Sequence, residues 1–193
     1  PICREFQENP FADDDGSARP ELLDAIKDFH ETGNPQQVFE EFTKSRLLIP
    51  LLADLGEAGE GAHGKTVDKS ADLSIVTVQT PDQQTALPVF SSVQTMLRWN
   101  AKARPVPSDA IRVALAAASE GTTRIVLDPG SESEFALRRA AIAAIAQQKS
   151  WTVPHLDSTV QENCADAVKN EKSISSIQVV SGDPMSRLAG AEI

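Results

Sequence analysis

The side chains whose types and spacing suggest chemistry lie in one glycine-rich stretch, residues 59–66, with the sequence GEGAHGKT. This stretch matches the pattern G-x-x-x-x-G-K-[ST] of a phosphate-binding loop, in which backbone N–H groups and the lysine surround nucleotide phosphates. Residues 124–128, RIVLD, resemble the apolar strand whose terminal aspartate holds magnesium in such proteins. Lys65, Thr66 and Asp128 would then form the site of a nucleotide-binding or hydrolytic enzyme.

The surroundings of this motif argue against such an enzyme. A phosphate-binding loop needs a strand that runs directly into it and a helix that begins at its lysine and points its N–H groups at the phosphates. Residues 54–58 separate the preceding apolar run from Gly59, and the interval from Thr66 to Leu73 is too short for a helix of several turns. We therefore favour a surface loop here and keep the enzyme as an alternative.

The remaining reactive side chains are scattered along the chain. No pair of them has the spacing of a metal site or of a nucleophile with its base. They are His30, His63, His155, Cys3 and Cys164. We therefore expect no catalytic residue, no cofactor and no bound metal. Two cysteines so far apart favour a reducing, cytoplasmic location, and Cys164 lies on an apolar helical stripe that predicts a buried thiol.

Composition limits the class of partner. The chain has 193 residues, 40% of them hydrophobic, which fits one compact domain with a substantial core. Its 18 lysines and arginines stand against 28 aspartates and glutamates, a net charge of −10. This charge disfavours nucleic acids and anionic membranes, because neutralising phosphates requires clustered basic residues. No apolar run reaches the roughly 20 residues that cross a bilayer, so we expect no membrane partner.

Residues 70–99 form the unit around which the other elements are arranged. The apolar run 73–78 predicts a strand inside a sheet, and Pro81-Asp82 predicts a turn over 80–84. A second strand, 85–90, contains Pro88, which lacks an N–H and places the strand at an edge or beside a bulge. Ser91 or Ser92 then caps a helix that reaches Trp99.

The same rules predict the elements on either side. Helices are expected over 21–30, ending at Gly33; from Pro35 through Phe42; from a cap at Ser108 to Gly121; around 142–146; and after a cap at Asp157 or Ser158. Strands are expected over 46–53, 125–127, 135–137 and 174–180. Pro50 places the first of these at an edge or bulge, and alternation makes 135–137 half-exposed. Residues 100–108, NAKARPVPS, are expected to be an extended connector.

These elements predict an α/β (α+β) fold, with a mixed sheet of about five to six strands flanked by helices. We expect a flexible acidic arm over 1–19, a single α/β domain with a helical N-terminal part over 20–150, and a helix-strand extension over 151–193 packed on that domain. No internal repeat is visible.

Four segments carry a resemblance to a known family: DKSAD at 68–72, ALPVFSS at 86–92, ARPVP at 103–107 and LDPG at 127–130. They occur in the same order as in the SseB N-terminal-domain family, which the chain resembles over roughly 47–148. The resemblance implies a small α/β protein. It supplies no catalytic residue and no cofactor.

The function that we favour is a non-catalytic module that binds a protein or peptide. Trp99 and Arg104 belong to the residue types enriched at binding hot spots, and Lys69 and Asp72 in the DKSAD segment complete the candidate binding set. Two other interpretations stay open. For Trp99 alone, a cap on the core is favoured over a binding hot spot, and a structural homo-oligomer is a third interpretation of the chain.

Overall fold

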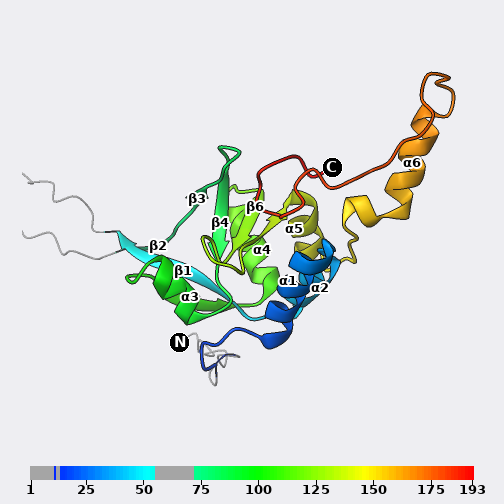
Figure 1. The fold of residues 1–193 in the computed structure, drawn as a ribbon. Helices are drawn as coiled ribbons and strands as arrows, with labels where there is room; N and C mark the ends of the chain where they lie inside the picture. The colour runs from blue at the N-terminus through cyan, green and yellow to red at the C-terminus, as the bar shows by residue number, and fades with distance from the viewer. Residues whose placement is uncertain (1–10, 12–13, 55–71) are drawn as a thin grey trace, which may run out of the picture.

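The computed structural model describes residues 11, 14–54 and 72–193. Within these residues the chain forms helices, strands and one short 3₁₀ helix, η1 (Figure 1). The α-helices are α1 (Pro20–Thr32), α2 (Gln36–Lys44), α3 (Val93–Trp99), α4 (Ala110–Ser119), α5 (Arg139–Ala146) and α6 (Ser158–Val168), and η1 is Pro154–Leu156. The strands are β1 (Leu47–Asp54), β2 (Asp72–Ile75), β3 (Val78–Gln79), β4 (Thr85–Val89), β5 (Arg104–Ser108), β6 (Arg124–Leu127) and β7 (Phe135–Arg138).

The strands form two sheets, not the single sheet of five to six strands that the sequence predicts. The first sheet is antiparallel with the order β2-β1-β5, and the second has the order β3-β4-β6-β7 with β4 and β6 parallel. The sheets meet where Leu48 on β1 and Phe90 after β4 exchange two backbone hydrogen bonds of 2.9 Å. The mixed α/β class is confirmed.

The strand expected over 73–78 is divided between the two sheets. β2 pairs with β1 and β3 pairs with β4, so the chain changes sheets between β2 and β3. Each piece is an edge strand, so the prediction of an interior strand is wrong. The turn that follows is confirmed, because the Thr80 N–H donates to the Gln84 carbonyl oxygen and the Gln83 N–H donates to that of Thr80, both at 2.9 Å.

Pro50 lies in the central strand of its sheet, which corrects the predicted edge position. It faces Pro105 of β5, and Leu48, two residues earlier, faces Pro107. The Leu48 N–H points toward the second sheet and away from β5. Because every second residue of a strand points its nitrogen to the same side, the Pro50 nitrogen also points away from β5. The missing N–H is tolerated there because β2 pairs with β1 only from Leu51 onward.

Pro88 is accommodated in a similar way. β4 lies between β3 and β6, which corrects the predicted edge position of this strand. β3 pairs only with Thr85 and Ala86, however, and Pro88 lies beyond its end. The proline ring therefore removes no donor from the β3–β4 ladder.

The proline-containing segment after α3 is a strand and not a connector. β5 pairs with β1 over its whole length. The predicted cap at Ser108 is also corrected, because the Asp109 carboxylate accepts the Arg112 N–H at 2.8 Å at the start of α4. The other caps are confirmed at Ser92, whose hydroxyl accepts the Thr95 N–H at 3.1 Å, and at Asp157.

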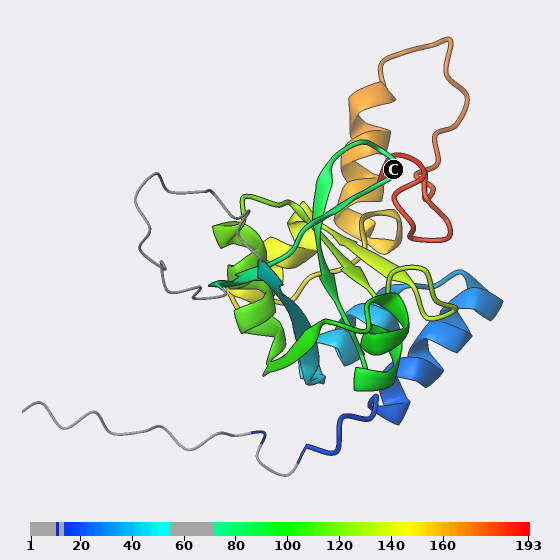
Figure 2. The same ribbon diagram turned by 90° about the vertical axis from the view of Figure 1, so that its left-hand side faces the viewer.

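The main core lies between the helices and one face of the four-stranded sheet. Helices α1, α2, α4 and α5 lie beside the sheet (Figures 1 and 2). Their buried apolar side chains belong to this core. The sheet contributes the inward-facing residues Leu87, Val89, Ile125, Leu127, Phe135 and Leu137. On the outer face the same strands present small residues, Ala86, Val126 and Ala136, which pack around Leu188.

This outer packing corrects the half-exposed strand predicted at 135–137. All three residues of that range are buried, because the C-terminal segment covers the outer face that was expected to face water. Alternation along β7 thus separates two buried faces, one against the helices and one against Leu188.

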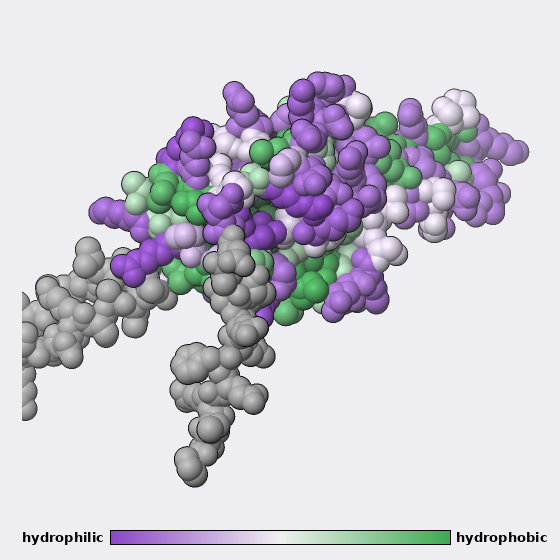
Figure 3. All heavy atoms as spheres, turned by 90° about the horizontal axis from the view of Figure 1, so that it is seen from below, coloured by the Kyte–Doolittle hydropathy of each residue, from purple (hydrophilic) through white to green (hydrophobic). Residues whose placement is uncertain are grey.

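The C-terminal part departs from the body and returns to it. Helix α6 stands out from the molecule, and the last residues lie back beside the sheet (Figure 1). Seen from below, hydrophobic side chains lie among hydrophilic ones on this projection (Figure 3). Residues 174–180 form no strand, and Cys164 is half-exposed, so both predictions are wrong. Helix α6 has no buried residue, and its Gln161 side chain is hydrogen-bonded to the backbone of His155 and Val179.

The described part of the N-terminal segment contacts the domain. Asp14 pairs with Arg46 just before β1 at 2.7 Å, and the Gly16 carbonyl oxygen accepts the Val93 N–H at 2.9 Å. Gly16 has a φ of 78°, and a Cβ there would meet the Val93 side chain. None of the helices in the described ranges has the length and apolar composition needed to span a membrane.

Candidate functional site

The parallel strands β4 and β6 end beside each other, and their carboxyl ends hold a buried carboxylate. Asp128 follows β6 and has a relative exposure of 0%. Its Oδ1 accepts the backbone N–H of Ser91 at 2.8 Å, and its Oδ2 accepts the hydroxyls of Ser91 at 2.6 Å and Ser133 at 2.7 Å. The carboxylate therefore joins the end of β4 to the loop between β6 and β7.

Burial raises the pKa of the Asp128 carboxyl above its ordinary value of 3.8, and the hydrogen bonds from Ser91 and Ser133 oppose that rise. Both carboxylate oxygens are occupied by protein donors. Asp128 is thus arranged as a clamp inside the fold and not as a ligand or base facing a substrate.

The raised pKa makes a prediction about stability. The folded chain holds the Asp128 proton at pH values where the unfolded chain has released it, so the stabilising contribution of this group is complete below about pH 3.8 and falls as pH rises through the folded pKa. Asp128→Asn cannot titrate. The unfolding free energy of the variant minus that of the wild type should therefore increase with pH from about 4 and then level off.

Urea unfolding of both proteins between acidic and neutral pH checks this expectation. A difference in unfolding free energy that stays constant over the whole range would contradict a raised pKa at Asp128.

Trp99 lies beside this clamp, at the end of α3. Its ring packs on Phe90 with centroids 5.3 Å apart and stays partly exposed. It borders two grooves. One, of about 700 Å³, is lined also by Thr95, Arg98 and the loop 129–133. The other, of about 360 Å³, lies over β3 and the outer face of the sheet and reaches Leu188.

Three cations surround Trp99 in the sequence: Arg98, Lys102 and Arg104. All three are exposed, and none forms an ion pair within the described part of the chain. The chain contains no acidic residue between Asp82 and Asp109. We call Arg98, Trp99, Lys102 and Arg104 the α3–β5 surface. It is a basic, aromatic region of a protein with a net charge of −10.

The four residues of the candidate binding set have different positions. Trp99 ends α3 and Arg104 begins β5, on either side of a short turn. Asp72 begins β2 opposite Asp54 of β1, and Lys69 lies outside the described residues. The structure thus places Trp99 and Arg104 at either end of one short turn and leaves the binding role of all four a prediction.

Sequence reasoning missed Arg98 and Lys102, although the absence of acidic residues around them was visible. It also missed the clamp role of Asp128, which no local pattern reveals because its partners lie 37 and 5 positions away. The residues of the nucleotide hypothesis, Lys65 and Thr66, lie outside the described residues.

The scattered reactive side chains that the structure describes lie on three different elements. His30 is on α1, His155 is in η1 and Cys164 is on α6. No group of three or more histidine, cysteine, aspartate or glutamate side chains in the described ranges is placed to hold a metal ion. His63 and Cys3 are among the residues not described.

A family model described as the SseB protein N-terminal domain matches residues 20–144, from the start of α1 to within α5. The chain belongs to the SseB family. Neither curated proteins nor solved structures offer a match to this SseB-family chain. The α3–β5 surface and the Asp128 clamp both lie within the SseB domain, whereas η1, α6 and the C-terminal residues follow it.

Proposed function

We propose that this SseB-family chain is a non-catalytic interaction module that binds an acidic protein or peptide through the α3–β5 surface. The observation that carries the proposal is that Arg98, Lys102 and Arg104, close to Trp99 in the sequence, form no ion pair with any of the residues that the structure describes. In a chain with 28 acidic and 18 basic residues, cations that no described acidic side chain pairs with are available to another molecule.

Trp99 supplies the apolar part of the surface. A partly exposed tryptophan beside a groove of about 700 Å³ is the kind of residue on which binding energy concentrates. Arg98 lines the same groove, so a carboxylate and an apolar side chain of one ligand would reach both residues. The ligand chemistry that fits is therefore an acidic segment that presents an apolar side chain.

We also propose a cytoplasmic location, because two cysteines far apart give no disulfide framework. The overall negative charge supports a protein partner over a nucleic acid, since three cations are few for neutralising a phosphate backbone.

Affinity capture from a native lysate tests the binding function. The immobilised wild-type chain is compared with Trp99→Ala and Arg104→Glu, and captured proteins are purified so that their Kd values are measured. We expect each change to weaken binding about tenfold or more, which is about 1.4 kcal/mol. High salt should weaken binding of the wild type, because the contacts are charged and exposed.

The matched control is Lys172→Glu, which reverses the charge of an exposed lysine after α6 and should leave binding unchanged. If Trp99→Ala and Arg104→Glu bind the same proteins as the wild type does, the α3–β5 surface is not the binding site. Light scattering on the same samples separates a partner from self-association: a dimer mass that Trp99→Ala reduces to a monomer mass would instead favour the homo-oligomer.

A further inference from the structure

The outer face of the four-stranded sheet is covered by a closed loop from the end of the chain. The Gly182 N–H donates to the Glu192 carbonyl oxygen at 3.5 Å, so the two ends of residues 182–192 lie together. A Cβ on Gly190 would collide with the Gly182 carbonyl oxygen, which shows how closely the ends approach. We call residues 182–192 the C-terminal loop.

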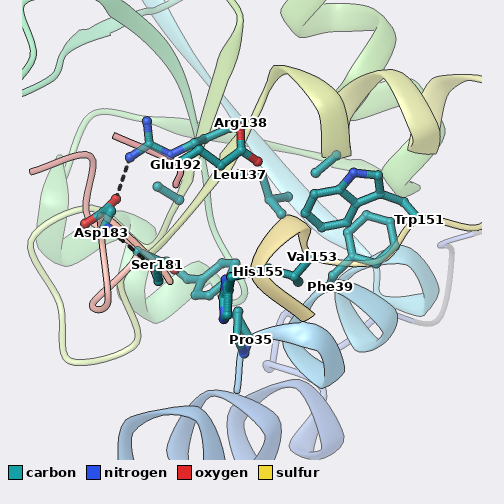
Figure 4. Close-up of a pocket in the computed structure, with 14 residues that line it drawn as sticks. Pro35, Phe39, Leu137, Arg138, Trp151, Val153, His155, Ser181, Asp183 and Glu192 are labelled. Atoms are coloured by element: carbon teal, nitrogen blue, oxygen red, sulfur yellow. Dashed lines mark hydrogen bonds and ion pairs between the residues drawn. The ribbon is translucent and has the colours of Figure 1, made fainter. Parts of the chain in front are cut away.

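Asp183 organises this loop and joins it to the sheet. Its carboxylate accepts the N–H of Arg187 at 3.2 Å and of Leu188 at 2.7 Å, which closes the turn. The same carboxylate pairs with Arg138 at the end of β7 at 2.7 Å (Figure 4). Arg138 also donates to the Gly190 carbonyl oxygen at 2.7 Å. One arginine of the sheet thus holds both ends of the C-terminal loop.

Leu188 fills the apolar part of the contact. It is 1% exposed and packs on Ala86, Val126 and Ala136, whose small side chains leave room for it. One backbone hydrogen bond, from the Ala136 N–H to the Ser186 carbonyl oxygen at 2.7 Å, joins the loop to the edge of β7. The contact therefore has the parts of a peptide complex: a carboxylate on an arginine, a leucine in a hollow and one main-chain bond.

The segment that connects the SseB domain to the C-terminal loop is mostly exposed and acts as a tether. Helix α6 has no buried residue, and 169–178 are all exposed. The backbone of Val179 is hydrogen-bonded to the Gln161 side chain of α6 and to none of the described residues of the SseB domain. The loop also lies beyond residues 20–144, which the family model matches. A segment from outside the domain is thus held on it by its own terminal contacts.

We propose that the outer face of the four-stranded sheet, with Arg138 at its edge, is a peptide-binding site of the SseB domain, and that the C-terminal loop is its tethered occupant. The ligand that it takes from another protein is a peptide that presents one carboxylate to Arg138 and a leucine-sized side chain to the sheet. The loop competes with that ligand within the same chain. This site does not depend on the binding function proposed for the α3–β5 surface, although Leu188 and Trp99 border one groove.

The probe for this site is a fluorescent peptide of residues 179–193, and the readout is its anisotropy with the full-length chain. In Asp183→Asn/Leu188→Ala the tethered loop is weakened and the site is free for the probe. We expect this variant to bind the probe about tenfold more tightly than the wild type, because a tethered segment competes at an effective concentration of about a millimolar. A probe that carries the same two changes should not bind.

Two controls sharpen the result. Adding Arg138→Gln to the loop variant should abolish binding, whereas Met185→Ala, a change at an exposed loop residue, should leave the probe at its wild-type affinity. The proposal is overturned if a folded loop variant binds the probe no better than the wild type, or if Arg138→Gln leaves that binding intact. Loss of binding by Trp99→Ala and Arg104→Glu in the capture experiment would leave this result unchanged.

Hydrogen exchange of the wild type tests the same proposal without a variant. The Ala136 amide donates to the loop, whereas the Asp128 amide donates to the Val89 carbonyl oxygen inside the sheet, at 2.8 Å. If the loop leaves the folded domain, the Ala136 amide exchanges at least about tenfold faster than that of Asp128, after correction for intrinsic rates. Equal protection would mean that the loop leaves only on global unfolding, and would overturn the proposal.

Discussion

Replacing Phe90 by alanine should lower the unfolding free energy by about 3 to 5 kcal/mol. Phe90 has no exposed surface and packs with Leu48, Met96 and Ala103 in a small core of its own. It also stands where the two sheets exchange backbone hydrogen bonds, so neighbouring strands restrict the collapse of the cavity. Urea unfolding measures the loss, and Phe90→Leu, which keeps most of the volume, should lose less.

The same change should be visible at Trp99, whose ring rests on Phe90. In a Trp151→Phe background, Trp99 is the single tryptophan, and Phe90→Ala should shift its emission to longer wavelength as water reaches the ring. A loss below about 1 kcal/mol together with unchanged emission would contradict the packing of Trp99 on this core.

Replacing Asp128 by alanine should lower the unfolding free energy by about 2 to 4 kcal/mol. The change leaves the buried N–H and hydroxyl of Ser91, and the partly buried hydroxyl of Ser133, without their acceptor. It also releases the end of β4 from the loop after β6. Chemical unfolding at neutral pH measures the loss.

Ser133→Ala is the matched control, because it removes one donor and leaves both bonds from Ser91 in place. We expect it to lose about 1 kcal/mol. If Asp128→Ala were as stable as the wild type, the carboxylate would not act as a clamp, and a role facing a ligand would have to be reconsidered.

Local rules predicted the helices well, because caps and apolar periodicity lie within a few residues of each other. Gly33 ends α1 with a φ of 73°, and Ser92 and Asp157 cap α3 and α6 as expected. The prediction of an N-cap at Ser108 is wrong, because the adjacent Asp109 caps α4 instead. Such a choice between neighbours depends on where the preceding strand ends.

The strands were harder to predict because each pairing partner lies far away in the chain. Residues 73–78 look like one strand, yet β1 takes the first part and β4 takes the second. The burial of Ala136 depends on Leu188, which is outside the domain and has no local pattern. The Asp128 clamp likewise needs Ser91, so the sequence shows its turn but not its hydrogen bonds.

The candidate site was predicted in part by residue type. Residue type identifies Trp99 and Arg104 as hot-spot candidates, and in the fold they lie at either end of the turn between α3 and β5. Their cationic neighbours Arg98 and Lys102 become informative only once the structure shows that no acidic side chain of the described residues pairs with them. Whether a charged side chain has an ion-pair partner depends on the fold, so the sequence alone does not reveal it.

The facing prolines of β1 and β5 restrict how any partner can approach Arg104. Since Leu48 points its N–H away from β5, the opposite residue Pro107, and Pro105 at the same phase, turn their nitrogens toward the free side of that strand. The free edge of β5 therefore lacks a backbone N–H donor at both Pro105 and Pro107. An incoming backbone cannot extend the three-stranded sheet there, so a molecule that binds beside Arg104 has to be recognised through its side chains.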